Sequence, residues 1–272
     1  MEPIEGELAL IPLTLDDIDD GMALVTEAGW NQTPADWRFM LTAGRGMGLR
    51  GDAGRVVATS IVLPYRPRVG WIGMVLVAGG YRKRGIATRL LRAAIEHCRR
   101  QQLTPMLDAT PAGREVYRRL SFAGGETIER WRGAGAGAGE PAGPVDVDLA
   151  ARMDRDAFGA DRRNLLADLA MRAGAPLFQR HGSVLLGRRG RTATQLGPLL
   201  SHDEAAALAL CERAVGAIAG PLLIDVPVRE EALRGLLASR GFGVERSFTR
   251  MSLGIAAPMG EAMRAIAGPE LG

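Results

Sequence analysis

The order of apolar and polar positions predicts alternating strands and helices in the first half of the chain. Residues 71–77 form an apolar run rich in β-branched side chains, which is typical of a strand buried on both faces. Apolar residues then recur at helical spacing from Ile86 to Ile95, which predicts an amphipathic helix. The same reasoning predicts further strands at residues 8–13, 47–50, 55–63 and 104–110.

Capping residues predict where the other helices of this half begin. Thr14 precedes several aspartates, which suit the positive end of a first helix that we expect to end near Gly29. Thr33-Pro34-Ala35-Asp36 is a capping box with proline at the first helical position, so a second helix begins there. A short helix that carries Tyr117 follows the strand at 104–110. The expected order is β-α-α-β-β-β-α, then a strand and this short helix.

The turn between the strand at 71–77 and the next helix is rich in glycine and cations. The first amides of a helix lack internal acceptors and carry partial positive charge, so they bind phosphate well. Gly85 has no side chain to keep a phosphate from the backbone. Residues 82–87, Arg-Lys-Arg-Gly-Ile-Ala, fit the pattern Arg/Gln-x-x-Gly-x-Gly/Ala, whereas neither GxGxxG nor GxxxxGK[ST] fits. The alternative is an ordinary basic helix start.

Together with the strand before it, this pattern resembles the acetyl-CoA pyrophosphate loop of the GNAT N-acetyltransferases. The expected order of elements is also that of the amino-terminal half of such proteins. The resemblance implies an α/β (α+β) fold, with a mixed, mostly antiparallel twisted sheet, one splayed pair of parallel strands and flanking helices. It implies acetyl-CoA as co-substrate, bound by Val75, Leu76, Val77, Arg82, Lys83, Arg84, Gly85, Ile86, Ala87, Thr88, Ala109, Arg114 and Tyr117.

The resemblance also implies a catalytic role for Tyr117, which matches the position of the family's usual general acid. The alternative is a tyrosine whose ring packs on the sheet with its hydroxyl in solvent. Backbone N–H groups near Leu76 and Val77 are expected to polarise the thioester carbonyl. No Glu, Asp or His occurs in residues 71–77, so no general base is evident there. Asp108 is one possibility, but a structural strand-end carboxylate or a water chain is the simpler expectation.

The second half of the chain echoes the first. Residues 223–227 resemble residues 106–110, and in each half a short helix then leads to a phenylalanine, at position 122 or 242. The helix start at 201–207 lacks the glycine and cations and bears carboxylates, which would repel a pyrophosphate. Leu237 replaces Tyr117. The pattern resembles bacterial tandem GNAT proteins with an intact first domain and a degenerate second one.

Low-complexity sequence separates the two halves. The Gly/Ala/Pro-rich stretch at 133–144 is typical of a flexible linker. The expected domains are therefore a catalytic, acetyl-CoA-binding GNAT domain at 1–132 and a degenerate GNAT-like domain at 145–272. We expect the second domain to shape the acceptor site.

The acceptor is expected to lie against the first two helices, on the side that faces the second domain. Trp30 and Asn31 fall in the connector between these helices, and Asp225 and Arg250 of the second half are candidates for the same surface. These four residues are the predicted substrate-binding set. A carboxylate there would favour a cationic amine. The alternative for each is a structural role.

Composition narrows the remaining classes of function. The cations are 33 arginines and one lysine, Lys83, with a net charge of only +3, and no basic run exceeds residues 82–84. Nucleic-acid binding is therefore not expected. No apolar run reaches the ~18 residues of a membrane span, so no membrane association is expected. Cys98 and Cys211 stand far apart, and the three histidines are scattered, so we expect no disulfide and no metal. The acidic amino-terminus is unlike a signal peptide, which favours the cytoplasm.

Two functions are consistent with these features. The first is an N-acetyltransferase that transfers the acetyl group of acetyl-CoA to the amine of a small molecule, by direct attack in a ternary complex. The second is a non-catalytic acetyl-CoA sensor or regulatory protein. Acyl length, acceptor identity and the choice between monomer and homodimer are left open by the sequence.

Overall fold

The computed structural model describes residues 8–139, 143–256 and 258–272. Its elements follow the predicted order in the first half, and the capping box forms as expected: Thr33 and Asp36 hydrogen-bond reciprocally at the start of the second helix. The elements of this half are β1 (Leu10–Pro12), η1 (Leu15–Asp17), α1 (Ile18–Glu27), α2 (Pro34–Ala43), β2 (Arg45–Arg50), β3 (Val56–Tyr65), β4 (Val69–Val77), η2 (Gly79–Tyr81), α3 (Ile86–Arg100), β5 (Thr104–Ala109), α4 (Pro111–Arg119) and β6 (Ala123–Ala136).

The second half repeats this arrangement with two helices, three strands, a long helix, a strand, a short helix and a long strand. Its elements are α5 (Val147–Phe158), α6 (Arg163–Met171), β7 (Leu177–Arg180), β8 (Ser183–Arg189), β9 (Thr194–Leu200), α7 (Glu204–Ala217), β10 (Ala219–Pro227), α8 (Glu231–Ser239), β11 (Gly243–Ser252) and β12 (Met263–Ala265). The fold is a mixed α/β structure with parallel and antiparallel strands and flanking helices, as expected.

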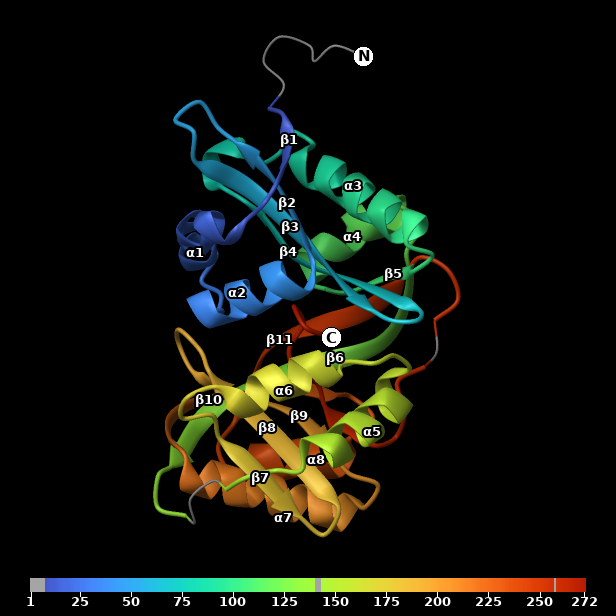
Figure 1. The fold of residues 1–272 in the computed structure, drawn as a ribbon. Coiled ribbons are helices and arrows are strands. Elements are labelled where there is room, and N and C mark those ends of the chain that lie inside the picture. The colour runs from blue at the N-terminus through green and yellow to red at the C-terminus, as the bar shows by residue number, and fades with distance from the viewer. Residues whose placement is uncertain (1–7, 140–142, 257) are drawn as a thin grey trace.

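All strands join one sheet in which the two halves exchange their last long strands. The order is β1-β2-β3-β4-β5-β11-β6-β10-β9-β8-β7, with β12 paired to β9. Strand β11 of the second half lies between β5 and β6, and β6 of the first half lies between β11 and β10 (Figure 1). Each half therefore completes its sheet with a strand from the other half.

The prediction of a flexible linker at 133–144 is wrong for its first residues, because Gly133–Ala136 form the end of β6. They pair in register with Ala219–Leu222 of β10. The glycines here allow close packing: a Cβ at Gly133 would lie 2.4 Å from the Phe242 ring. Residues 140–142 lie outside the described residues. Because β6 belongs to the sheet of both halves, the proposed division at residue 132 stays a prediction.

The parallel strands β4 and β5 diverge along their length. They pair through Val69–Trp71 and Thr104–Met106, and no pairing between them is found beyond Trp71 and Met106 among these fully described strands. A bulge follows in β4, where Met74 has a φ of 53° and its carbonyl accepts a hydrogen bond from the Thr59 hydroxyl at 2.8 Å. The expected splayed pair is therefore present in the first half.

The equivalent gap in the second half is filled by the chain itself. Strands β9 and β10 pair in parallel through Thr194–Leu196 and Leu222–Ile224. Beyond these residues β12 pairs with β9, and the amide of Ile266 donates to the Asp225 carbonyl on β10 at 3.0 Å. The segment that follows β12 ends in the middle of the molecule, between the halves (Figure 1).

Helices cover both faces of the sheet. Helices α1, α2, α5 and α6 pack on one face and share a single apolar core that spans both halves. On the opposite face, α3 and α4 cover the first half and α7 and α8 cover the second half, each with its own core. We call the first of these the α2/α6 face and the second the α3/α7 face.

Two buried ion pairs join the halves at the centre of the sheet. Arg250 on β11 donates twice to Asp108 on β5, at 2.9 Å each. Arg130 on β6 donates twice to Asp225 on β10, at 2.8 Å each. The pairs are reciprocal, because each half supplies the arginine for the other half's aspartate.

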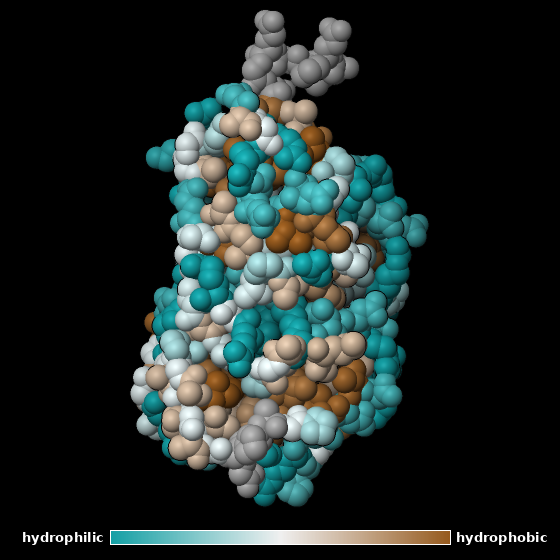
Figure 2. Space-filling model, turned by 60° about the vertical axis from the view of Figure 1, so that its left-hand side comes forward, coloured by the Kyte–Doolittle hydropathy of each residue, from teal (hydrophilic) through white to brown (hydrophobic). Residues whose placement is uncertain are grey.

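The outer surface is mixed in polarity. On the face drawn in Figure 2, hydrophobic residues form separate patches among hydrophilic ones. The exposed large apolar side chains are scattered over both halves, from Leu10 to Ile255. Within the described ranges, no helix has the length and apolar character needed to cross a bilayer.

Candidate functional site

The loop between β4 and α3 presents an open helix start. Gly85 is the N-cap of α3, with a φ of 75° that side chains rarely adopt, and a Cβ there would meet no other atom within 4 Å. Lys83 also has a positive φ, of 62°. The first amides of α3 thus face open space beside a cationic turn. This geometry fits an anionic phosphate group.

Arg82 has a different position from that expected of a phosphate ligand. Its Nε donates to the Val77 carbonyl at 2.9 Å, and its Nη2 donates to Glu27 at 2.9 Å. The same Glu27 oxygen accepts the Gly79 amide at 2.7 Å. The Arg82 side chain therefore holds the loop in shape together with Glu27, a residue of α1 that the sequence analysis did not single out.

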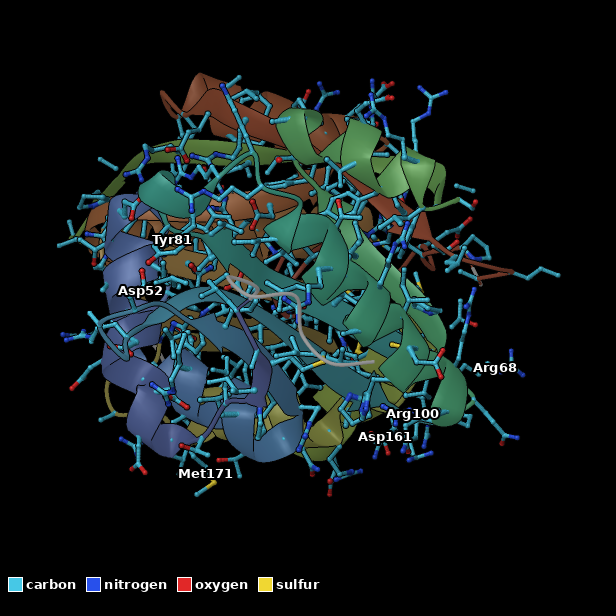
Figure 3. All side chains as sticks on the ribbon, turned by 90° about the horizontal axis from the view of Figure 1, so that it is seen from above. Asp52, Arg68, Tyr81, Arg100, Asp161 and Met171 are labelled. Atoms are coloured by element: carbon cyan, nitrogen blue, oxygen red, sulfur yellow. The ribbon has the colours of Figure 1, made fainter. Side chains whose placement is uncertain are left out.

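A groove lies beside this loop and the first turns of α3. Arg84, Gly85, Ile86 and Thr88, all predicted to bind the cofactor, line it together with Arg89 and Arg92. Tyr81 and Asp52 also line it, and they lie near one another when the molecule is seen from above (Figure 3). The Arg84 guanidinium stacks over the Tyr81 ring at 5.3 Å. The charged residues of the groove are three arginines and one aspartate, so its net charge is positive, which suits a phosphate-bearing ligand.

A cavity of about 220 Å³ passes through the sheet where β4 and β5 diverge. Its lining includes Leu91 and Val116, which belong to the core on the α3/α7 face. It also includes Trp30 and Phe248, which belong to the core on the α2/α6 face. The cavity therefore connects the two faces. Of the residues predicted for the cofactor, it is lined by Val75, Ala87 and Tyr117.

Tyr117 stands on the cavity wall on the α3/α7 face. Its ring packs beside Phe122, with centroids 6.0 Å apart, and against Gly113 one helical turn earlier. Burial raises the pKa of Tyr117 to about 12. The phenol therefore keeps its proton at neutral pH and can donate it into the cavity.

The other predicted cofactor residues lie around this cavity without lining it. Ala109 ends β5 and precedes Thr110, which was not predicted but does line the cavity and caps α4 by accepting the Gly113 amide at 3.2 Å. Arg114 lies in α4 and is exposed. Leu76 and Val77 form the end of β4 before the loop.

The two connector residues predicted for the acceptor have different roles. Trp30 lines the cavity. Asn31 instead joins the halves: its Oδ1 accepts the amides of Thr192 and Ala193, at 2.8 and 3.0 Å, and its Nδ2 donates to the Ala193 carbonyl. Both polar atoms of the Asn31 side chain thus form hydrogen bonds within the chain. Asn31 therefore has a structural role, which was the alternative to acceptor binding.

Asp225 and Arg250 do not line the cavity either. Asp225 is fully buried and is bound by Arg130 and by Gln195, whose Nε2 lies 3.0 Å from its Oδ2. Arg250 is bound to Asp108 and stacks over the Trp71 ring at 4.7 Å. Burial raises the pKa of Asp108, and the neighbouring guanidinium opposes this rise. Direct contact of Asp225 with a cationic acceptor is therefore not supported.

The carboxyl-terminal segment forms part of the cavity wall that sequence reasoning missed. The Trp71 indole donates to the Pro269 carbonyl at 3.0 Å, and the Tyr65 hydroxyl donates to the Leu271 carbonyl at 2.9 Å. Pro269 and Glu270 line the cavity, and Glu270 forms an ion pair with Arg188. No local pattern marks this segment, because its position depends on contacts with residues 198 and 206 positions earlier in the chain.

The lining residues that were not predicted include three with amide or guanidinium side chains, Gln32, Arg130 and Arg246. A signal for Arg246 was present in the sequence, since Arg246-x-Phe248-x-Arg250 alternates along a strand and places these side chains on one face. Gln32 follows the connector residues already singled out. Arg130 gave no local signal.

Comparison with known proteins agrees with this fold. Residues 19–122 match the model of the acetyltransferase (GNAT) family, and residues 150–265 match that of an acetyltransferase (GNAT) domain. The matches and the fold define a protein with two acetyltransferase domains in tandem. The chain belongs to the GNAT family, and it is accordingly an acyltransferase.

Several known proteins are similar to this chain over most of their length. The uncharacterized N-acetyltransferase YitH of Bacillus subtilis is 24% identical over 86% of this chain and 87% of its own. A putative acetyltransferase from Pyrococcus horikoshii has the same fold, with a TM-score of 0.82, 22% identity, and coverage of 100% and 98% of the two chains. A tandem GNAT protein from the clavulanic acid biosynthesis pathway matches with a TM-score of 0.60 and 15% identity, over 92% and 100% of the chains.

Proposed function

We propose that this protein transfers the acetyl group of acetyl-CoA to the amine of a small molecule. The first half supplies the catalytic site, and the second half shapes the acceptor side of the cavity. The observation that carries the proposal is the cavity through the sheet, which joins Tyr117 on one face to Trp30 on the other. Two substrates that enter from opposite faces meet in such a cavity, as direct attack in a ternary complex requires.

The residues around the splayed strands suit acetyl-CoA. The α3 amides and the basic groove beside Gly85 would hold its phosphates, because they combine open helix-start donors with arginine side chains. The gap between β4 and β5 would accept its narrow arm, since these strands leave backbone groups unpaired there. The same gap in the second half is closed by β12, so we assign a single acetyl-CoA site to the chain.

Tyr117 is the proton donor in this proposal. The thioester sulfur needs a proton as it leaves, and a phenol with a pKa near 12 holds one throughout the physiological range. No base is assigned to a side chain. The two carboxylates of the cavity wall, Asp108 and Glu270, are bound to Arg250 and Arg188. The proton of the amine therefore passes to water.

The experiment compares acetyl-CoA binding, measured by calorimetry, with thiol release in the presence of an amine panel. Gly85→Glu places a carboxylate at the helix start and should abolish acetyl-CoA binding. Gly182→Glu is the matched control, because Gly182 has the same φ of 75° and the same open surroundings on the β7–β8 turn. Tyr117→Phe should keep binding and lower kcat by about 100-fold or more, as loss of a general acid does.

The outcomes separate this function from the alternative sensor. Turnover of one amine, lost in Gly85→Glu and slowed in Tyr117→Phe, supports the transferase. Tight acetyl-CoA binding with no thiol release from any amine would instead favour a non-catalytic sensor. Equal binding by Gly85→Glu and the wild type would contradict the assigned acetyl-CoA site.

A further inference from the structure

The acceptor side of the cavity contains one positive charge that the protein does not neutralise. Arg246 lines the cavity and is half-buried, and it has no ion-pair or hydrogen-bond partner among the residues that the structure describes. The other charged lining residues all have partners: Asp108 pairs with Arg250, Arg130 with Asp225, and Glu270 with Arg188.

Arg246 is on the acceptor side because of its place in β11. Arg246 and Phe248 are two residues apart in a regular stretch of the strand, so their side chains share a face of the sheet. Phe248 belongs to the core of the α2/α6 face. The helix start at Gly85 is on the other face, with α3. Arg246 is therefore not placed to bind the phosphates assigned to that loop.

A second group on this side of the cavity lacks a partner. Gln32 is only 4% exposed and lines the cavity, and its buried Oε1 accepts no hydrogen bond within the described parts of the chain. A buried carbonyl oxygen without a donor costs free energy unless a ligand supplies one. An amine is a suitable donor. Gln32 follows Trp30 and Asn31 in the α1–α2 connector.

From these two groups we infer that the acceptor is an amine that also carries an anionic group. The amine donates to Gln32, and the anionic group binds the Arg246 guanidinium, which matches carboxylate or phosphate oxygens with paired donors. Half-burial strengthens this attraction over that of a surface arginine. The inference rests on the proposed function and specifies its acceptor class.

The surroundings reject a purely cationic amine. Such a substrate would bring an additional positive charge beside Arg246, and the carboxylates nearby are already held by arginines. Asp225 was the residue expected to attract a cationic acceptor, but its carboxylate is fully buried and paired with Arg130. A free amino acid and a phosphorylated amino sugar both satisfy the two groups, so the shared feature is an amine with an anion.

The test uses matched acceptors that differ in one charge. Phenylalanine is compared with phenylalanine amide, methionine with methioninamide, and glucosamine 6-phosphate with glucosamine, by thiol release at saturating acetyl-CoA. We expect the anionic member of at least one pair to have a kcat/KM about 10- to 100-fold higher, the range of a charged hydrogen bond. The amino-acid and sugar pairs show whether the anion is a carboxylate or a phosphate.

Variants of Arg246 test whether this residue causes the preference for the anionic acceptor. Arg246→Gln should remove the preference for the anionic member and leave acetyl-CoA affinity unchanged, and Arg246→Lys should restore part of it. Arg180→Gln is the control, since Arg180 is an exposed arginine on β7 at the far edge of the sheet. It should behave as the wild type.

Three results would overturn the inference while leaving acetyl-CoA binding intact. One is an equal or higher kcat/KM for the uncharged members of every pair. Another is a preference that survives in Arg246→Gln. The third is that no anionic amine of the panel is acetylated or bound. Failure of acetyl-CoA itself to bind the wild type would instead contradict the proposed function.

Discussion

Arg250→Met tests the ion pair that joins β11 to β5. The substitution leaves the Asp108 carboxylate, which is fully buried, without its two hydrogen bonds of 2.9 Å. Removal of one partner from a buried pair costs about 3–5 kcal/mol, because the remaining charge is uncompensated. We therefore expect the free energy of unfolding at pH 7, measured by urea denaturation without acetyl-CoA, to fall by about this amount.

The pH dependence of this loss in the free energy of unfolding gives a second test. Burial raises the pKa of Asp108, and loss of the arginine removes what opposes that rise. In the folded variant this pKa would lie well above its unfolded value of about 3.9. The folded state then binds the proton more tightly than the unfolded state, so the penalty should shrink as the pH falls from 7 toward 5.

The controls come from the same centre of the sheet. Arg250→Met with Asp108→Asn removes both charges and should be less destabilised than Arg250→Met alone. Arg130→Met breaks the reciprocal pair, but Asp225 keeps its bond from Gln195, so its loss should lie at the low end of the range. A stability of Arg250→Met within about 1 kcal/mol of the wild type, as for an exposed pair, would refute the reasoning.

Three further predictions concern the loop, the acid and acid stability. Glu27→Ala removes the acceptor that holds Gly79 and Arg82, so we expect the KM for acetyl-CoA to rise by about tenfold with kcat little changed in steady-state assays; an unchanged KM would contradict this. Because the pKa of Tyr117 is about 12, this phenol stays protonated below pH 10. We therefore expect kcat of the wild type and kcat of Tyr117→Phe to vary with pH in the same way up to pH 10, and an alkaline loss seen only in the wild type would contradict this. Burial alone would raise the pKa of Asp36, but its two arginine partners lower this pKa below 3.8. The ionised Asp36 therefore stabilises the fold above pH 4, and this contribution is lost as the pH falls further. The free energy of unfolding should thus decrease less steeply from pH 4 to pH 2 in Asp36→Asn than in the wild type.

Local pattern was sufficient to predict the elements and the glycine-capped helix start after β4. The capping box at Thr33 and the strand-turn-helix around Gly85 depend on neighbours within a few residues, and both are found as expected. Tyr117 likewise follows from its place in a short helix after β5. Their roles in binding and catalysis stay predictions.

Long-range pairing was not predictable in the same way. The exchange of β6 and β11 depends on which strand edges meet, and the pattern of residues along one strand does not specify its neighbour. Gly133–Ala136 were assigned to a linker because glycine and alanine are typical of flexible segments. In the fold, their small size instead lets β6 pass close to Phe242 and to the Ile218 carbonyl.

The side of the cavity proposed for the acceptor was hardest to predict because it is built from both halves. Asn31 and Asp225 are polar residues at plausible positions, but the structure uses them for hydrogen bonds within the chain. Glu270 reaches the cavity only because the segment after β12 crosses between the halves. Sequence alone does not distinguish a polar group with an internal partner from one left for a ligand.

The strand exchange also makes the first half depend on the second for a complete sheet. Without β11, the first half would expose the edge of β5, and open strand edges promote aggregation. It would also lose Arg250 and leave Asp108 uncompensated. Deletion of the second half would therefore remove a strand from the first, so the two halves form one structural unit whichever of them binds a ligand.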